Sequence, residues 1–245
     1  MAIPKIAIQA RLWGLDRVER EPESVFDEVH RAGYDGIECR SKMLIEQEER
    51  LLHCASANSI SIIALHANLK SFDTEDRRQV LGDLLERMNR AGSKYLLVSM
   101  GRMPEYRKWF ELASELSEYC SQAQVRLCYH NHAGEFENGY RFFDELTRTY
   151  NVDLAADLAW VYRAGTNVEE FIERYAAHIK YVHLKDTAGE QWKELGEGEV
   201  PLSPILQRVL ALKLPWWTVE QDSTDRAPAV SAIMSRKYVS DQFGF

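Results

Sequence analysis

The chain has 245 residues, of which 45% are hydrophobic and 28% are charged, and its formal net charge is −8 at pH 7. These values are typical of a globular protein that buries a core without needing disulfides or a structural metal. The negative charge argues against a protein that binds duplex nucleic acid, because such proteins present a cationic surface to the phosphates. A small anionic or neutral ligand in a local pocket is compatible with this net negative charge.

The cysteines and the apolar runs indicate the cellular environment. The four cysteines form no Cys-x-x-Cys pair, and Cys39 and Cys128 lie in apolar runs where buried thiols are expected. The first residues contain no basic segment followed by a long apolar stretch, so we expect no secretory signal. The apolar runs are too short for a helix that spans a membrane. We therefore predict a reduced, soluble, cytoplasmic protein.

Short apolar runs recur along the chain, and each is followed by a longer amphipathic segment. Near-continuous apolar character over such short runs predicts strands that are buried on both faces, as in a parallel sheet. Eight runs have this character, at residues 5–10, 36–39, 60–66, 94–100, 125–130, 152–157, 179–184 and 215–220.

Between these runs, apolar residues repeat at the helical period. One helix is predicted to begin at Pro22, and a second runs from Thr74 to Gly92, a residue typical of helix C-termini. Pro104 is predicted to open the next helix, because proline is favoured in the first helical turn. Asn167 is the expected N-cap of a later helix.

A strand followed by a helix, repeated eight times at roughly 25–35 residues per unit, predicts a single-domain (β/α)8 TIM barrel over residues 1–245. The alternative is a doubly wound open sheet, but no Gly-x-Gly-x-x-Gly run follows the first strand. No linker, low-complexity tract or composition shift divides the chain.

In such barrels the functional residues lie at the carboxyl ends of the strands. Six predicted strands end on or near a carboxylate or a histidine: Glu38, His66, His130, Asp157, His183 and Glu220. Residues i and i+2 of a strand share a face, so a second set is predicted to point the same way: His132, Lys185 and Asp222. The last four strands would present imidazole, carboxylate, imidazole and carboxylate around one mouth, which is a donor set for a divalent transition metal.

Each of these residues also has a purely structural interpretation. One buried histidine or aspartate at a strand end is more often a hydrogen-bonding group than a metal ligand, but four on consecutive strands favour a metal. For Glu38 and His66, a contact with substrate and a structural hydrogen bond both stay open. Trp160 is a candidate for lining a pocket. The Gly-Glu-Gly segment at 196–198 is too short and too acidic for a phosphate-binding loop, so it predicts a tight loop.

Six segments, in their order along the chain, resemble the sugar isomerase/epimerase superfamily of xylose isomerase-like barrels, in the subgroup with a Tyr-His-Asn-His run on the fifth strand. These segments are residues 33–38, 129–139, 157–165, 181–189, 194–200 and 219–222, and together they extend over nearly the whole chain. The resemblance implies one divalent metal ion, Mn²⁺ first, with Co²⁺, Mg²⁺, Fe²⁺ and Zn²⁺ as other candidates. It also implies the ligand set His130, Asp157, His183 and Glu220.

Two positions depart from the pattern of this family. Many relatives have a glutamate in place of His130, and in them two glutamates flank the substrate carbon as acid and base, whereas here only Glu220 is left of that pair. Many relatives also have a histidine where this chain has Trp160. The related abasic-site endonucleases use that histidine, so this difference and the acidic charge both oppose a nuclease.

The resemblance implies a metal-dependent sugar isomerase or epimerase that abstracts a proton next to the carbonyl of a keto-sugar or related polyol, through a metal-stabilised enediolate. Glu220 is the expected base, with His132 or Lys185 as acid or oxyanion stabiliser. A lysine in an enclosed site near a cation is expected to have a lowered pKa. The remaining candidates are predicted to contact substrate: Glu38, His66, Asn131, Trp160 and Asp222.

Two other functions stay open on the same scaffold. A keto-sugar or keto-inositol dehydratase, or a 3-keto-glycoside lyase, is favoured by His130 and Trp160. A sugar-binding barrel without turnover belongs to a different class. No strongly basic loop indicates a phosphate site, which favours a non-phosphorylated polyol. Aromatic residues that we expect on the surface, Tyr140, Phe142 and Phe143, permit a homodimer.

Overall fold

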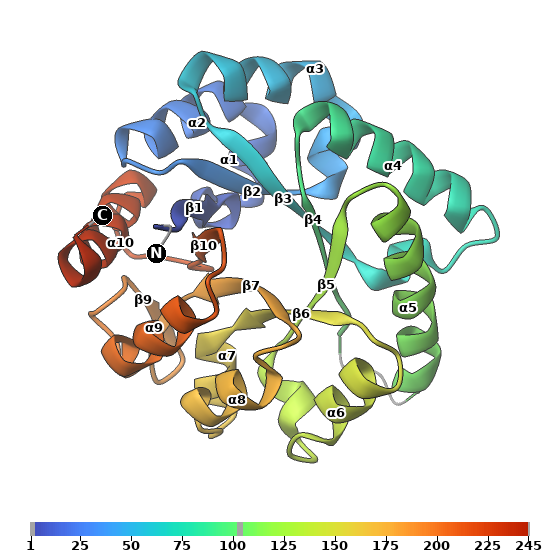
Figure 1. Ribbon diagram of the computed structural model, residues 1–245. Helices are drawn as coiled ribbons and strands as arrows, with labels where there is room; N and C mark the ends of the chain where they lie inside the picture. The colour runs from blue at the N-terminus through green and yellow to red at the C-terminus, as the bar shows by residue number, and fades with distance from the viewer. Residues whose placement is uncertain (1–2, 102–104, 245) are drawn as a thin grey trace.

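The computed structural model describes residues 3–101 and 105–244. Eight parallel strands close into a barrel, and helices surround it (Figure 1). Around the ring the order is β1-β10-β7-β6-β5-β4-β3-β2, so each strand pairs with its neighbours in chain order and β10 pairs with β1. The closed ring confirms the predicted (β/α)8 barrel and excludes the open doubly wound sheet.

The eight predicted apolar runs coincide with the eight barrel strands. These strands are β1 (Lys5–Gln9), β2 (Gly36–Arg40), β3 (Ser61–Asn68), β4 (Tyr95–Ser99), β5 (Arg126–His130), β6 (Asp153–Asp157), β7 (Ile179–Leu184) and β10 (Trp216–Val219). A short antiparallel hairpin follows β7 and was not predicted; it consists of β8 (Asp186–Ala188) and β9 (Gln191–Lys193).

The helical segments also follow the sequence pattern. The α-helices are α1 (Leu15–Arg20), α2 (Pro22–Arg31), α3 (Ser41–Asn58), α4 (Arg77–Ala91), α5 (Tyr106–Gln122), α6 (Arg141–Arg148), α7 (Leu158–Arg163), α8 (Val168–Tyr175), α9 (Leu202–Ala211) and α10 (Pro228–Phe243), and the 3-10 turns are η1 (Ala10–Trp13), η2 (Leu69–Phe72) and η3 (Ala133–Phe136). Asn167 caps α8 as predicted, since its side chain accepts a hydrogen bond from the Glu170 backbone N–H. Gly92 ends α4 in the left-handed conformation. Pro104 lies outside the described residues.

Strand alternation sorts the side chains into an outer and an inner set. The outer set packs against the helices and forms the large hydrophobic core. Inside the barrel, an apolar cluster fills the amino-terminal end: Ala7, Ile63, Ala64, Leu97, Cys128, Ala155 and Tyr181. The inner positions toward the carboxyl-terminal end are polar.

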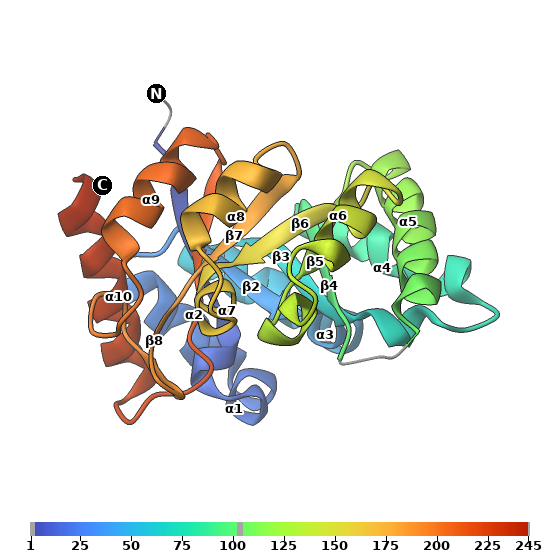
Figure 2. The same ribbon diagram turned by 90° about the horizontal axis from the view of Figure 1, so that it is seen from below.

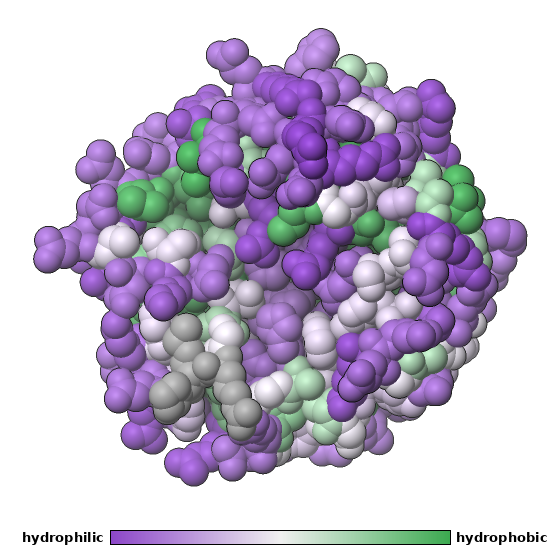
Figure 3. Space-filling model, turned by 180° about the vertical axis from the view of Figure 1, so that it is seen from behind, coloured by the Kyte–Doolittle hydropathy of each residue, from purple (hydrophilic) through white to green (hydrophobic). Residues whose placement is uncertain are grey.

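The carboxyl-terminal end of the barrel is the face opposite the chain's N-terminus, as the view in Figure 2 shows. On this face hydrophilic residues gather in a central hollow (Figure 3). The apolar cluster therefore closes one end of the barrel, and the other end is left for polar side chains.

All four cysteines are buried free thiols, as predicted for Cys39 and Cys128. Among the described helices, none combines the length and the apolar character that crossing a membrane requires. The expected aromatic surface patch is wrong: Phe143 is fully buried, and Phe142 is 9% exposed. Both rings pack inward, with the Phe143 ring centre 5.2 Å from that of Phe171. These side chains therefore give no support for a homodimer.

The loop predicted at residues 196–198 wraps tightly around one carboxylate. The backbone N–H groups of Gly196 and Gly198 donate to Asp186 Oδ2 at 2.9 and 3.0 Å. Those of Thr187 and Val200 donate to Asp186 Oδ1 at 2.8 and 3.1 Å. A Cβ atom on Gly198 would lie 2.2 Å from Oδ1, so this approach requires a glycine.

We expect Gly198→Ala to lower the free energy of unfolding by about 2 kcal/mol, because the added methyl group pushes the Asp186 carboxylate away from its N–H donors. Gly82→Ala is the matched control: it lies in α4, and no atom is within 4 Å of the added Cβ. This variant should keep or slightly raise stability, since alanine favours helix. Urea unfolding measures both, and equal stability of the two variants would contradict the tight packing.

Candidate metal centre

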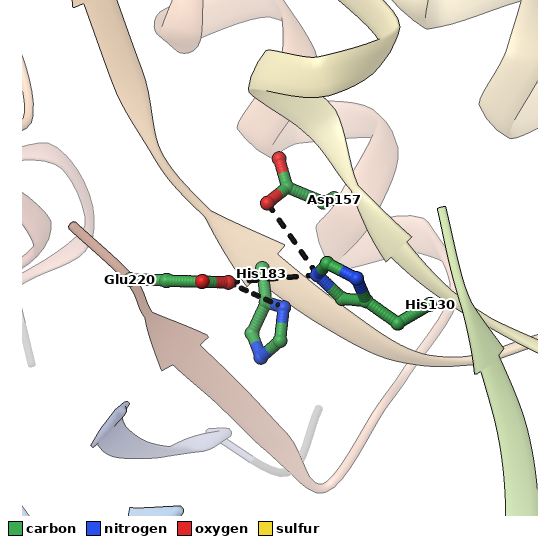
Figure 4. Close-up of side chains that lie close together, drawn as sticks. All are labelled: His130, Asp157, His183 and Glu220. Carbon is green, nitrogen blue, oxygen red and sulfur yellow. Dashed lines mark ion pairs between the residues drawn. The ribbon is translucent and has the colours of Figure 1, made fainter. Parts of the chain in front are cut away.

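Four buried side chains converge at the carboxyl-terminal end of the barrel (Figure 4). They come from the ends of β5 and β6, from β7, and from the residue after β10: His130, Asp157, His183 and Glu220. One possible ligand atom of each lies within 4.8 Å of all the others. His130 Nε2 is 3.6 Å from Asp157 Oδ2 and 3.6 Å from Glu220 Oε2. His183 Nδ1 is 2.8 Å from Glu220 Oε2.

Several polar atoms of this cluster make no hydrogen bond of regular geometry within the described part of the chain, although His183 Nδ1 and Glu220 Oε2 are in close ion-pair contact. The atoms without such a hydrogen bond are both ring nitrogens of His130, Nδ1 of His183 and Oε2 of Glu220. Buried polar atoms are normally paired, and leaving them unpaired costs stability. Nitrogen and carboxylate oxygen atoms aimed at one point are what a divalent cation coordinates, so the residues fit a metal ion.

The charges around the cluster also favour a cation. Burial alone would lower the pKa of His130 and His183, but the adjacent carboxylates raise the pKa of both imidazoles. Burial would likewise raise the pKa of Asp157 and Glu220, but Lys185 and the histidines hold both below the ordinary carboxyl value. The carboxylates therefore stay ionised and attract positive charge to this point.

Glu38 lies deeper in the barrel and orients one member of the cluster. It accepts hydrogen bonds from His183 Nε2 at 2.7 Å, Tyr181 Oη at 2.9 Å and Gln9 Nε2 at 3.2 Å. With Nε2 engaged, the His183 Nδ1 faces Glu220, as is typical of a metal-binding histidine held by a second carboxylate. Glu38 is fully buried and positions His183, while its predicted contact with substrate stays a prediction.

His66 contacts the cluster from β3. Its Nε2 is 3.1 Å from Ser99 Oγ, and its ring centre is 4.9 Å from that of His130. Burial, together with the charge of His130, lowers the pKa of His66 to about 4, although the Glu38 carboxylate at 3.5 Å opposes this shift. A neutral imidazole in this position packs beside the cluster without adding charge to it.

Asn131 fixes the backbone of a candidate ligand. Its Nδ2 donates to the Asp157 carbonyl at 3.1 Å, and its Oδ1 accepts from the Asp157 N–H at 2.9 Å. Asp157 Oδ1 accepts from the Trp160 N–H at 3.0 Å and caps α7, which leaves Oδ2 to face the cluster. Both ends of the Asn131 amide are thus hydrogen-bonded within the chain, and its predicted contact with substrate stays a prediction.

Lys185 is buried among three carboxylates. Its Nζ lies 2.6 Å from Asp222 Oδ2, and 3.4 Å from both Asp157 Oδ2 and Glu220 Oε1. Burial alone would lower the pKa of Lys185, but these carboxylates raise it above its ordinary value. Within the chain itself the pKa of Lys185 is therefore raised and the lysine is a cation, which is the opposite of the direction predicted for a lysine beside a bound metal ion.

Asp222 links two cations at the rim of the barrel. Its Oδ1 is 2.7 Å from Arg11 Nε, and its Oδ2 holds Lys185. Asp222 thus pairs with both of these cations, and its predicted contact with substrate stays a prediction. Arg11 was missed by the sequence analysis, although it follows Gln9 by two residues, the spacing that singled out Lys185.

Two tryptophans and a histidine form one wall of the mouth. The Trp160 ring centre is 4.8 Å from that of Trp192 and 5.5 Å from that of His132. Lys185 Nζ lies 4.0 Å from the Trp192 ring centre, a cation–π distance. Trp192, on the unpredicted hairpin, was also missed. His132 is 40% exposed and lines a cavity of about 750 Å³ that Ser99 and Phe142 also border.

A buried glutamate anchors the segment after β10. Glu194 Oε1 accepts from Ser231 Oγ at 2.6 Å, Thr224 Oγ1 at 3.1 Å and Gln221 Nε2 at 3.4 Å. Gln221 lies between the two carboxylates of segment 220–222, so Glu194 holds in place the chain that carries them. The sequence showed Glu194 only as part of a family-like segment.

A sequence profile of the family described as xylose isomerase-like TIM barrel matches residues 26–236. Among curated proteins, an inosose dehydratase of Geobacillus kaustophilus is 26% identical over 160 residues, which are 54% of this chain and 52% of that protein. The chain thus spans about half the length of the curated relatives it matches.

Solved structures show the same architecture. The structure of an L-ribulose 3-epimerase superposes with a TM-score of 0.77 at 16% identity, covering 99% of this chain and 95% of that one. The structure of the IOLI protein with a binding zinc atom has a TM-score of 0.73 at 18% identity and covers 97% of both chains. At these identities the likeness establishes a shared fold.

The low pKa of His66 predicts a pH dependence of stability in chelator-treated protein. The unfolded chain takes up a proton near the ordinary histidine pKa of about 6.5, whereas folded His66 does so near 4. The stability that neutral His66 contributes is thus complete above pH 6.5 and is lost as the pH falls through that window. Urea unfolding between pH 7 and pH 4 measures the loss.

His66→Gln should flatten this part of the pH profile relative to the original chain. His53→Gln, which replaces an exposed histidine on α3, should keep the original slope. Parallel profiles for the original chain and His66→Gln would contradict the assigned protonation state.

Proposed function

Because the chain belongs to the xylose isomerase-like TIM barrel family, we propose that it is an enzyme that uses one divalent metal ion to remove a proton next to the carbonyl of a keto-sugar or related polyol. The observation that carries this proposal is the convergence of four buried side chains at the barrel mouth, His130, Asp157, His183 and Glu220. Three of them, the two histidines and Glu220, have polar atoms without a hydrogen bond.

The metal itself is proposed from the donor set. Two imidazoles and two carboxylates suit Mn²⁺, which we propose first, and also Co²⁺, Fe²⁺ or Zn²⁺, with Mg²⁺ less suited to nitrogen ligands. The IOLI structure, which shares this fold, contains a zinc atom, and this supports the proposal of a divalent ion. A bound divalent ion would supply a Lewis acid that polarises the substrate carbonyl.

Glu220 is the proposed base of the reaction. Its pKa is held low, so it is ionised at neutral pH, and its Oε1 points away from the histidines toward Lys185 at 3.4 Å. Asp157 is less suited, since its Oδ1 is occupied by the Trp160 N–H. Glu220 is therefore the carboxylate of the cluster with an oxygen atom that can accept a proton.

Lys185 is the proposed stabiliser of negative charge that develops on the substrate. Three carboxylates keep it protonated, and its ammonium group is already dehydrated, so it interacts strongly with an oxyanion. His132 lies at the rim, between His130 and the 750 Å³ cavity, where it can donate a proton to a leaving hydroxyl group. A cavity of that size is in the range of small-molecule sites.

One available carboxylate base favours elimination. Removal of water or of an alcohol needs one base and one acid, whereas two-base epimerisation needs a proton-transfer group on each face of the carbon. The mouth provides Glu220 on one side and His130, an imidazole, on the side where a second glutamate is common in the family. We therefore favour a dehydratase or lyase, and the match to inosose dehydratases supports this choice.

An isomerase or epimerase is the second candidate. Lys185 and His132 both lie at the mouth and could supply the second proton-transfer group in place of a carboxylate. The fold shared with an L-ribulose 3-epimerase is compatible with it.

The shared first step is tested by proton exchange. Metal-loaded protein is incubated in D₂O with 2-keto-myo-inositol and with a panel of ketoses, and deuterium uptake next to the carbonyl is followed by NMR. We expect uptake that chelator abolishes and Glu220→Gln suppresses at least 100-fold, as for loss of a general base. No uptake on any of these compounds would contradict the proposal and favour a sugar-binding barrel without turnover.

The metal ligands are tested by metal content. Asp157→Asn should weaken Mn²⁺ binding by at least tenfold, because an anionic ligand becomes neutral. Asp153→Asn is the matched control at the opposite end of the same strand and should bind Mn²⁺ as the original chain does. Calorimetric titration measures both, and unchanged affinity of Asp157→Asn would refute its role.

The choice between elimination and epimerisation is tested at His130. His130→Glu restores a carboxylate that still suits a divalent metal, so Mn²⁺ binding should persist. The variant should raise epimerised product relative to eliminated product on the same keto-sugar, while His53→Glu should not. An unchanged ratio with metal bound would show that residue 130 does not decide the outcome.

A further inference from the structure

Arg40 is a cation at the mouth that the proposed chemistry does not use. It ends β2, two residues after the buried Glu38, and its register partner on β3 is His66. Because residues i and i+2 share a face, the Arg40 side chain rises above Glu38 on the inner side of the barrel. There it lines a small cleft together with Arg11, Glu38 and His66.

This guanidinium group has no direct partner among the described residues. Arg40 is half-buried, yet no hydrogen bond or ion pair joins it to another group in residues 3–101 or 105–244. Burial lowers the pKa of Arg40, and the like charge of Arg11 lowers it further. Removing a charge from water without pairing it is costly, so the position favours an anion from outside.

The carboxylates within electrostatic range of Arg40 are already engaged. Glu38 accepts three hydrogen bonds, among them one from His183, and Glu220 belongs to the proposed metal centre. At the rim above this level, Arg11 is paired with Asp222, and Lys185 is paired with Asp222, Asp157 and Glu220. Among the described residues of the rim, Arg40 is therefore the cation whose charge is left without a carboxylate partner.

We propose that Arg40, with Arg11 beside it, binds a carboxylate group of the substrate, so that the substrate is a sugar acid or a carboxylated cyclitol. This inference rests on the proposed function, because it assigns the far end of the molecule whose carbonyl faces the metal centre. The planar guanidinium fork matches a carboxylate in a bidentate pair. An anion between Arg40 and Arg11 also relieves their repulsion.

A carboxylate fits this site better than a phosphate. A phosphate monoester carries a charge of about −1.5 to −2 at neutral pH, whereas one unpaired guanidinium offers a single compensating charge. The extra negative charge would lie near Asp222 and Glu220, which repel it. The charge balance at the rim therefore selects a monoanion.

The test compares sugars that differ only in the anionic group. Calorimetry on Mn²⁺-loaded protein gives the affinities of D-glucuronate, D-glucose and D-glucose 6-phosphate, and of the pair D-gluconate and D-sorbitol. We expect each acid to bind about 10- to 100-fold more tightly than its neutral partner, as for a charge-assisted bidentate pair. Arg40→Gln should remove this preference, and Arg40→Lys should keep part of it.

Arg126→Gln is the control, since it removes the same charge from the amino-terminal end of β5. It should keep the preference. Acids and neutral sugars that bind equally to the original chain, or an acid preference that survives Arg40→Gln, would overturn the inference; a stronger, Arg40-dependent preference for the phosphate would overturn the carboxylate assignment.

Mn²⁺ affinity and deuterium exchange separate this inference from the proposed function. Arg40→Gln should bind Mn²⁺ like the original chain. If Mn²⁺ binding and exchange are intact while the acid preference is missing, the inference fails alone. If the acid preference depends on Arg40 but no compound undergoes exchange, the proposed function fails and the anion site stands.

Discussion

Closure of eight parallel strands sends every second side chain into the barrel, and this constraint decides what the mouth contains. Inward-pointing side chains from alternate strands stack in layers, so the chemical character of the interior changes from layer to layer along the axis. Apolar side chains and Tyr181 fill the amino-terminal level. The candidate ligands lie in the polar part of the interior above this level. A charged rim follows, formed by the residues two positions after Gln9, Glu38, His130, His183 and Glu220, namely Arg11, Arg40, His132, Lys185 and Asp222.

The candidate ligands are held by a layer of neutral and charged partners within the chain. Glu38 fixes the ring of His183, and Asn131 fixes the backbone of Asp157. Glu194 holds the segment after β10. Such partners lock the direction of each ligand before a metal arrives, which lowers the entropic cost of assembling the centre.

The sequence predicted the barrel and its strands because short buried runs and amphipathic helices leave a strong periodic pattern. It also placed the four candidate ligands together, since strand ends meet at one mouth. It did not reveal that Glu38 holds His183 and that Asn131 holds the Asp157 backbone, because these hydrogen-bond partners are more than 20 residues away in the chain. The raised pKa of Lys185 was not predicted for a related reason. Three carboxylates from other strands raise this pKa by more than burial lowers it.

Arg11 and Trp192 were missed because the first lies in a turn and the second on a hairpin too short to show a strand pattern. The same i+2 rule that selected Lys185 applies to Arg11 and Arg40. It was applied only to strands that end in predicted metal ligands, so these two arginines were not selected. What surrounds a rim residue depends on neighbouring strands, and only the closed barrel reveals it.

The most direct test of this account is a crystal structure of the protein with Mn²⁺, with the metal located by anomalous scattering. The account predicts one strong peak with ligand atoms of His130, Asp157, His183 and Glu220 at about 2.0–2.3 Å. A mouth without a peak at saturating Mn²⁺, or a metal bound by other side chains, would contradict it.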